Sequence, residues 1–393
     1  MLEEILGLVR KHEDWRVKGC LNLIPSENVM SPAVRSLLCS DLGHRYTSTD
    51  RFYMGTKFVD KIELYGEKLA EEVFEAETAD LRPLSGHIAN WIFLSTWASS
   101  HDKVLCVSAD DGGYPGVWKE GLTSLLGLQV VGFPFSKRRM NIEANEAAEL
   151  VRREKPKIVI FGASLFLFPH PVQEVTEAAS EVGATVGYDG SHVLGLIAGK
   201  TFQQPLKEGA CILYGSTHKS FFGPQGGIIV ADKQHGESVK KRLFPMFVDN
   251  AHWNRIAALT LALAEMKAFG KRYAEQVVRN AQTLAKVLYD DGFPVMCPEQ
   301  GFTQSHQVLL DYGGYKQGMK IARELERANI IADCGVRLGA CEVTRRGMRE
   351  SEMEKIAEFI KRQVADKEKP ERMRKEVMKL VQEFQQVEYC FDA

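Results

Sequence analysis

The chain has 393 residues, of which 45% are hydrophobic and 26% are charged, so it can bury a large core and form two or more domains. Its formal net charge of −2 gives no electrostatic reason to bind nucleic acid or an anionic membrane. A small neutral or zwitterionic substrate fits this charge better. No apolar stretch reaches the roughly 18 residues that a spanning helix needs, and residues 1–15 have the pattern of an amphipathic helix, not of a signal peptide. We therefore predict a cytoplasmic protein.

The cysteines do not form a recognisable framework. All eight are scattered, without a CxxC pair, and the histidines do not cluster at metal-ligand spacing. The sequence therefore predicts free thiols and no metal site.

In chain order, short apolar runs alternate with amphipathic helical stretches from about residue 66 to 235. The runs that we interpret as strands, several of them apolar on both faces as in a covered parallel sheet, are 103–108, 128–135, 157–164, 184–190, 210–216 and 226–232. Further along, the patterns predict helices at 236–244 and 254–293, strands within 306–312 and 330–339, and charged helices within 350–386.

This order predicts an α/β fold with a large, doubly wound, mostly parallel sheet domain and a smaller C-terminal α+β domain. The predicted boundaries are an N-terminal segment at 1–65, a large domain at 66–281 and a small domain at 282–393. The helix at 254–293 is a natural bridge between the two domains. There is no low-complexity linker, so the domains should share an interface.

Lys219 and Asp189 lie just past the ends of two predicted strands, where open α/β sheets bind ligands. A lysine and a carboxylate at neighbouring strand ends can hold pyridoxal phosphate (PLP). The lysine would form the Schiff base and the aspartate would hold the pyridine nitrogen protonated. A buried ion pair is the structural alternative, and these two residues alone do not decide between them.

Other residue types complete such a site. Ser85 and Gly86 start a predicted helix, where N–H groups and a hydroxyl can cradle a phosphate, and residues 216–218 add hydroxyl and ring donors. Tyr114 lies on a glycine-rich turn and could stack on the cofactor ring. For the carboxylate of an amino acid, Arg345 and Arg346 offer guanidinium groups in a predicted loop.

Six ordered motifs resemble those of the serine hydroxymethyltransferases, which are fold type I PLP enzymes. The motifs run from about residue 20 to 360 and read LNLIPSENVMSPAV, RFYMGTKFVDKIE, RPLSGHIAN, YDGSHVLGLIAGK, GSTHKSFFGPQGG and GVRLGACEVTRRG. This resemblance implies a PLP-dependent transferase or aldolase that acts on a small amino acid as a homodimer with shared active sites.

The resemblance also implies roles for single residues. The predicted catalytic residues are Lys219, Asp189, His192 and Tyr53. The predicted cofactor contacts are Ser85, Gly86, His87, Tyr114, Ser164, Asp189, His192, Ser216, His218 and Lys219. The predicted substrate contacts are Ser26, Tyr46, Tyr53 and Arg346, with Tyr46, Tyr53 and the segment 244–253 contributed to the neighbouring subunit.

The departures from the family concern the folate half of the site. The stretch HRYTSTDRFY is shorter than in the family and has Ser48, Thr49 and Asp50 where the family has a glutamate that contacts folate. The long loop that the family carries ahead of its GxRxG motif is mostly missing before Arg337. Tyr114 also stands where the family has a stacking histidine, and Asp249 and Asn250 replace small glycines.

Three functions are compatible with this pattern. The first is aldol-type cleavage or formation of the Cα–Cβ bond of glycine, serine or another β-hydroxy amino acid, without tetrahydrofolate. The second is cleavage of the Cα–H bond, which gives racemisation or transamination with Lys219 as the base. The third is a regulatory protein that binds PLP without turnover, although a carboxylate clamp would then have no purpose.

Overall fold

The computed structural model describes residues 1–47 and 52–392, so the predicted positions Ser48, Thr49 and Asp50 lie outside the described residues. The chain divides into two compact units, which are described separately. Unit 1 consists of Met1–Val29 and Glu275–Tyr389, and unit 2 consists of Met30–Ala274 with the end of the chain from Cys390.

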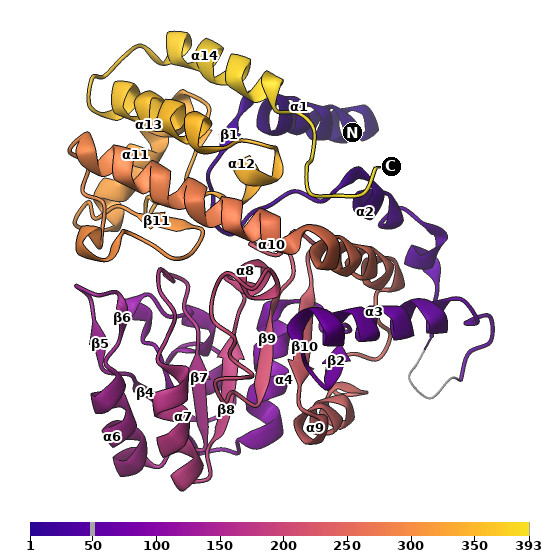
Figure 1. Ribbon diagram of the computed structural model, residues 1–393. Coiled ribbons are helices and arrows are strands. Elements are labelled where there is room, and N and C mark those ends of the chain that lie inside the picture. Colours follow the sequence, from indigo (N-terminus) through magenta and orange to yellow (C-terminus); the bar gives the residue numbers. More distant parts are fainter. Residues whose placement is uncertain (48–51, 393) are drawn as a thin grey trace. The chain divides into compact units, whose positions relative to one another are not determined.

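Unit 2 is built around a seven-stranded sheet with the order β2-β10-β9-β8-β7-β3-β4 (Figure 1). Its strands are parallel apart from β10, which runs antiparallel to β2 and β9. In chain order they are β2 (Thr78–Asp80), β3 (Lys103–Cys106), β4 (Gln129–Gly132), β7 (Ile158–Phe161), β8 (Thr185–Asp189), β9 (Ile212–Ser216) and β10 (Gly227–Ala231). This arrangement confirms the predicted fold class of a large, mostly parallel sheet.

The six apolar runs all form strands of this sheet. Every residue of β7, β9 and β10 is buried, as expected for strands that are covered on both faces. The prediction for 128–135 is too long, because β4 ends at Gly132 ahead of Pro134, a residue that cannot donate to a strand ladder. After the proline, β5 (Phe135–Ser136) and β6 (Asn141–Ile142) form a separate antiparallel pair.

Helices cover the sheet of unit 2. The helix α4 packs against β8, β9 and β10, while α7 packs against β8 and α6. The bounds are α2 (Pro32–Leu37), α3 (Val59–Phe74), α4 (Gly86–Trp97), α5 (Leu122–Leu125), α6 (Ala144–Glu154), α7 (Val172–Glu181), α8 (Leu194–Ala198) and α9 (Lys233–Leu243). The predicted helix at 254–293 is confirmed as α10 (Trp253–Asp290), which runs from unit 2 into unit 1.

Unit 1 joins the two ends of the sequence. The strand β1 (Leu21–Asn22) pairs in parallel with β12 (Ile330–Ile331), and α1 (Leu2–Gly19) packs against α14 (Pro370–Glu383). A second pair is antiparallel and consists of β11 (Gln307–Leu309) and β13 (Arg337–Gly339). The remaining helices are α11 (Tyr315–Arg327), α12 (Cys341–Arg345) and α13 (Glu350–Val364). The domain boundaries predicted at residues 65 and 281 remain a prediction.

Within the part of the chain that the structure describes, no helix is both long enough and apolar enough to cross a membrane.

Candidate active site

The candidate cofactor residues of unit 2 gather where parallel strands end. Asp189 is the last residue of β8, and Ser216 is the last residue of β9, three positions before Lys219. The loops that follow β3 and β7 carry Tyr114 and Ser164. Because β3, β7, β8 and β9 are parallel, these four ends share one edge of the sheet, as the sequence predicted.

Asp189 is held by two donors. Its Oδ1 accepts the N–H of Ser191 at 2.9 Å, and its Oδ2 accepts the side-chain amide of Asn90 at 2.7 Å. Asn90 is oriented in turn by Tyr214, whose hydroxyl donates to Asn90 Oδ1 at 3.0 Å. All of these side chains are buried, so the carboxylate has a fixed direction. Asn90 and Tyr214 were missed in the sequence, although a buried asparagine in an otherwise apolar helix was the available signal.

The start of α4 forms a cradle for an anion. Ser85 is the N-cap and accepts the N–H of Ile88 at 3.1 Å, which leaves its own proton available to a ligand. Gly86 follows, and a Cβ at that position would stand 2.4 Å from Ser216 Oγ and 3.0 Å from Ser191 Oγ. The hydroxyls of Ser216 and Ser191 therefore lie at the N-terminus of α4, which carries the positive end of the helix dipole. A phosphate fits this donor set.

The turn between β9 and β10 presents the lysine. Thr217 is fully buried and donates its hydroxyl to Pro224 O at 2.6 Å, so the prediction that it serves as a phosphate donor is wrong. Burial, and then the charge of Lys219, lower the pKa of His218 to about 4, so its imidazole is neutral near pH 7. Within residues 1–47 and 52–392, the buried Nδ1 of His218 has no hydrogen-bond partner. Lys219 itself is half-buried.

Tyr114 and His87 form a pair beside this edge. The Tyr114 hydroxyl and His87 Nδ1 are 3.0 Å apart, and the two rings meet edge-on with centroids 6.0 Å apart. Burial raises the pKa of Tyr114, and the charge of Asp189 adds to that effect. Ser164 lies in the neighbouring loop, where its N–H donates to Gly112 O at 2.8 Å. Gly112 has a φ of +88°, a conformation that favours glycine.

His192 lies three residues after Asp189, in the turn that leads to α8, and is buried with 6% exposure. The residues predicted to hold PLP therefore lie in one unit. Tyr114, Ser164 and Asp189 lie at or after the ends of the neighbouring parallel strands β3, β7 and β8, and residues 85–87 follow β2, which pairs with the antiparallel β10. The oriented carboxylate, the cradle at Gly86 and the lysine after β9 match the three chemical parts of that cofactor.

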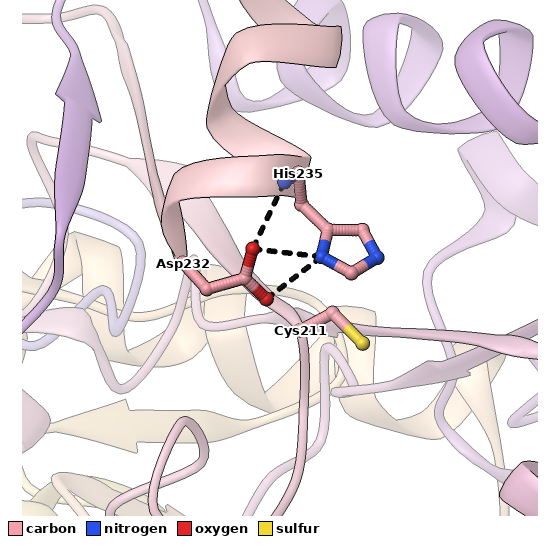
Figure 2. Close-up of side chains that lie close together, drawn as sticks. All are labelled: Cys211, Asp232 and His235. Carbon is pink, nitrogen blue, oxygen red and sulfur yellow. Dashed lines mark hydrogen bonds and ion pairs between the residues drawn. The ribbon is translucent and has the colours of Figure 1, made fainter.

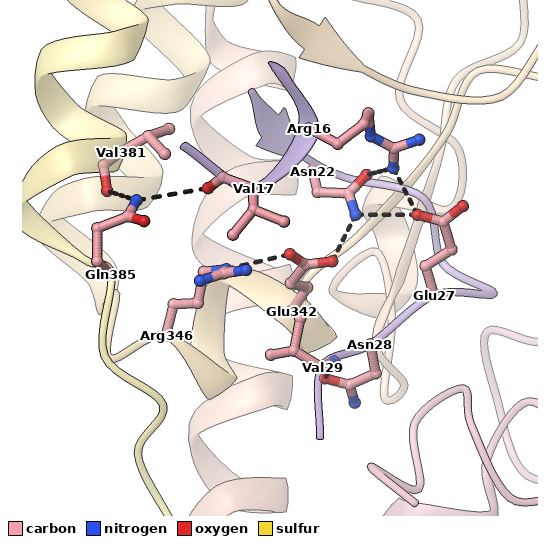
Figure 3. A network of polar contacts seen from close by, with 10 residues as sticks. All are labelled: Arg16, Val17, Asn22, Glu27, Asn28, Val29, Glu342, Arg346, Val381 and Gln385. Carbon is pink, nitrogen blue, oxygen red and sulfur yellow. Dashed lines mark hydrogen bonds and ion pairs between the residues drawn. The ribbon is translucent and has the colours of Figure 1, made fainter. Parts of the chain in front are cut away.

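Arg346 lies in unit 1, in a network of polar side chains (Figure 3). Its Nε donates to Glu342 Oε1 at 3.1 Å, and the two side chains are 9% and 8% exposed. Asn22 donates to the other oxygen of Glu342 and also to Glu27 Oε2, at 2.9 Å. Arg16 donates to Asn22 and Glu27 at 2.7 Å each. The hydrogen bond to Glu342 uses the Nε of Arg346 and not its terminal nitrogens.

Arg345 differs from its neighbour. The prediction that both arginines lie in a loop is wrong, because α12 ends at Arg345 and Arg346 is its C-cap. Arg345 is fully buried, and its Nη1 donates to the carbonyl oxygens of Glu388 and Tyr389 at 2.6 and 2.5 Å. It therefore anchors the C-terminal segment, and it is neither solvated nor a spare substrate ligand.

Ser26 also belongs to unit 1. It lies in a turn after β1, next to Glu27 of the Arg346 network. Its neighbour Pro25 packs on β13, since a Cβ at Gly339 would stand 2.4 Å from Pro25 Cα. The predicted carboxylate ligands Ser26 and Arg346 thus lie in the same unit, and Ser26 directly precedes Glu27 of that network.

Tyr46 and Tyr53 lie together in unit 2. Their ring centroids are 4.8 Å apart, and the Tyr46 hydroxyl donates to Asp249, which raises the pKa of Tyr46 to about 12. The backbone N–H of Thr47 donates to Asn250 at 3.1 Å. The tyrosines and the segment 244–253, which the resemblance assigns to the neighbouring subunit, are therefore joined in one group of this chain.

Comparisons with known proteins show the family to which the chain belongs. The family described as serine hydroxymethyltransferase matches residues 2–360. A serine hydroxymethyltransferase from Methanocaldococcus jannaschii is 44% identical over 406 aligned positions, which cover 98% of this chain and 94% of the relative. One from Methanocella arvoryzae is 45% identical, with 95% of this chain and 92% of the relative covered.

Among solved structures, the L-threonine transaldolase from Pseudomonas fluorescens, in its internal aldimine state, matches with a TM-score of 0.94. It is 28% identical, and the match covers 100% of this chain and 94% of that one. The protein is thus an enzyme of fold type I whose cofactor is pyridoxal 5'-phosphate, and its chemistry on amino acids is of the aldol type. The chain belongs to the serine hydroxymethyltransferase family.

Proposed function

We propose that this enzyme cleaves or forms the Cα–Cβ bond of a small β-hydroxy amino acid, such as serine or a related compound, without tetrahydrofolate as the one-carbon carrier. The observation that carries the proposal is the connection between β12 and β13. It consists of residues 332–336, where, by the resemblance, the family carries a long loop that embraces the pterin.

This connection is a closed turn. Asp333 Oδ2 accepts the Nε of Arg337 at 2.6 Å, and Asp333 Oδ1 accepts the N–H of Gly335 at 2.9 Å. The alignment with the M. jannaschii relative runs over 406 positions, more than the 393 residues of this chain, so that relative has segments that this chain lacks. Tetrahydrofolate is a bulky, anionic ligand whose pterin needs convergent polar contacts, and this turn is too short to supply them.

The residues of unit 2 would hold the cofactor. Lys219 supplies the amine, Asp189 holds the proton of the pyridine nitrogen, and Ser85, Gly86 and Ser216 bind the phosphate. When bound, PLP supplies an electron sink for charge that develops at Cα. The neutral imidazole of His218 can donate or accept a hydrogen bond beside the lysine without adding a second positive charge.

The residues of unit 1 would bind the amino acid. Arg346 offers two terminal nitrogens to a carboxylate, and Ser26 adds a hydroxyl. Removal of the proton from the β-hydroxyl group falls to Tyr53, His192 or a bound water molecule. The chain therefore retains the residues for the amino-acid half of the reaction.

The transaldolase among the solved structures supports this assignment. Its name gives L-threonine as the substrate, which is a β-hydroxy amino acid, and mentions no one-carbon carrier. Racemisation and transamination remain the alternative reactions of the same residues.

The test is to incubate the purified enzyme with serine, threonine and longer β-hydroxy amino acids and to measure aldehyde release with and without tetrahydrofolate. We expect aldehyde from at least one substrate at a rate that tetrahydrofolate does not change. Calorimetric titration with tetrahydrofolate in the presence of glycine provides a second measurement. Tight, glycine-dependent binding, at about micromolar or better, would contradict the proposal, and a keto acid or a racemised product without aldehyde would support the alternatives.

We also propose that the active form is at least a homodimer and that it is cytoplasmic. Exposed aromatic and apolar side chains lie next to Tyr53 in the sequence, namely Phe52 (74% exposed), Met54 (86%) and Phe58 (68%). Side chains of this kind seldom remain open to water in such numbers. The resemblance to the family implies that a second copy of the chain covers these exposed side chains.

Hybrid complementation tests the shared site. A Lys219→Ala chain mixed with a Tyr53→Phe chain should regain activity, because one of the two sites in a hybrid dimer would then be intact. Sedimentation that shows an active monomer would contradict the proposal.

A further inference from the structure

Three side chains with metal-binding atoms meet at the opposite ends of β9 and β10 from the candidate active site. Cys211 directly precedes β9, Asp232 directly follows β10, and His235 lies in the first turn of α9. Because β9 and β10 are antiparallel, with Ile212 opposite Ala231, the residue before one strand lies beside the residue after the other. The sequence could not show this cluster, since strand pairing and not ligand spacing creates it.

The geometry of the cluster is compact (Figure 2). The ligand atoms of Cys211, Asp232 and His235 all lie within 4.8 Å of one another. Both carboxylate oxygens of Asp232 lie near His235 Nδ1, at 2.7 and 2.9 Å. The imidazole packs against Trp97, with ring centroids 5.6 Å apart, and its side chain is 21% exposed, whereas that of Asp232 is 43% exposed. The ring is therefore held in place while the carboxylate remains open to an ion from solvent.

We propose that Cys211, Asp232 and His235 form a binding site for a divalent ion of zinc-like chemistry. A thiolate, an imidazole and a carboxylate are the three ligand types that Zn²⁺ takes in proteins, and three protein ligands leave one tetrahedral position for water. Zinc–ligand bonds of about 2.0–2.3 Å require ligand atoms closer than 4.8 Å, so the cluster must contract by about 1 Å. Rotation of the cysteine side chain can supply this movement.

The charges of the cluster suit such an ion. A thiolate and a carboxylate together neutralise a divalent cation. Zinc ligands must be deprotonated, so binding of the ion should release protons and should weaken in acid.

The ion would connect three elements of unit 2, namely the start of β9, the end of β10 and the first turn of α9. It would stabilise the folded state by mass action, because an unfolded chain does not hold these ligands together. The site lies at the far end of β9 from Lys219, and five residues of strand span about 17 Å. Its role is therefore structural or regulatory and separate from the amino-acid chemistry.

The test uses the holoenzyme, stripped of metal by a chelator and titrated with Co²⁺ as an optical probe. We expect one Co²⁺ per chain, with a thiolate-to-metal absorption band in the near ultraviolet in the difference spectrum against the metal-free protein. Zn²⁺ should then displace Co²⁺ and abolish the band, with release of protons that calorimetry in two buffers detects.

Variants decide whether these residues hold the ion. Cys211→Ser should abolish the thiolate band, and Asp232→Asn, which retains an N-cap side chain for α9, should weaken binding at least tenfold. Cys39→Ser, which alters an exposed cysteine, is the matched control and should change nothing. The absorbance of bound PLP reports whether each variant is folded. The proposal is overturned if the wild-type protein shows no thiolate band, or if the Cys211→Ser protein binds Co²⁺ with the same band and affinity.

Discussion

Glu342 offers the sharpest test of how the chain prepares Arg346 for a substrate carboxylate. The two side chains are 8% and 9% exposed and their ionic groups are 3.1 Å apart, so Glu342→Ala would leave a guanidinium almost fully buried without its counter-ion. Loss of one partner of a buried pair costs about 3–5 kcal/mol of unfolding free energy. Glu342→Gln keeps an acceptor for Arg346 but turns an amide donor towards the amide of Asn22, which should cost about 1–3 kcal/mol.

Substrate binding then separates two roles of Glu342. If the carboxylate orients Arg346, Glu342→Ala should weaken amino-acid binding, by up to the roughly 2–5 kcal/mol that the loss of Arg346 itself would cost. If Glu342 only neutralises charge, its removal should strengthen the attraction of the site for a carboxylate. We expect weakening, measured as the dissociation constant of glycine from the change in cofactor absorbance.

A double-mutant cycle supplies the control. Glu342→Ala combined with Arg346→Ala removes both charges, so the double variant should be more stable than Glu342→Ala alone. Glu354→Ala changes an exposed glutamate of α13 and should leave both stability and glycine binding unchanged. Native stability together with unchanged glycine binding in the Glu342→Ala protein would refute this account of the network.

Four further outcomes follow from the site. Borohydride reduction should attach the cofactor to one peptide that contains Lys219, and labelling of another lysine by mass spectrometry would contradict the assignment. Asp189→Asn should retain some cofactor but lose most turnover, and wild-type turnover in that protein would refute its role. Arg346→Ala should raise KM for the amino acid and should also lower stability, because it leaves the buried Glu342 without its counter-ion. Arg345→Ala should lower the melting temperature, since it frees two buried carbonyls, but should leave KM nearly unchanged. A raised KM in the Arg345→Ala protein with an unchanged KM in the Arg346→Ala protein would show that their roles are exchanged. Burial lowers the pKa of His170 to about 3 from 6.5, so acid favours the unfolded state, which binds the proton first. The contribution of His170 to the unfolding free energy should therefore fall by up to about 1.4 kcal/mol per pH unit between these values, and His170→Gln should make the measured slope shallower by that amount; an unchanged slope would contradict this prediction.

The strands of unit 2 could be predicted because their physical signal is local. Buried parallel strands are apolar on both faces, and each run from residue 103 to 232 carries this pattern with turn residues beside it. The position of Lys219 followed from that signal, since the carboxyl ends of parallel strands share one edge. The strand β2, Thr78–Asp80, was missed because three residues with two polar side chains have no such pattern.

Contacts between distant segments were beyond the reach of the sequence. The parallel pairing of Leu21 with Ile330 builds the N-terminal residues into unit 1, but two-residue strands give no periodicity to detect. Nothing in the sequence indicated that Arg345 is buried. Its partners are main-chain carbonyls near the end of the chain, and every residue type has such a carbonyl.

The same reasoning explains why the predicted cofactor and substrate ligands are easier to find in the sequence than the residues that orient them. Lys219 and Asp189 must be a lysine and an aspartate for chemical reasons, so their identity is visible in the sequence. The residues that fix their direction need only offer a hydrogen bond of the right geometry. Asn90 serves Asp189 in this way and Glu342 serves Arg346, and each lies four positions along a helix from a residue of the site, Gly86 in one case and Arg346 in the other. One helical turn brings such pairs onto the same face, so polar residues at that spacing from a predicted ligand are the first place to seek a supporting partner.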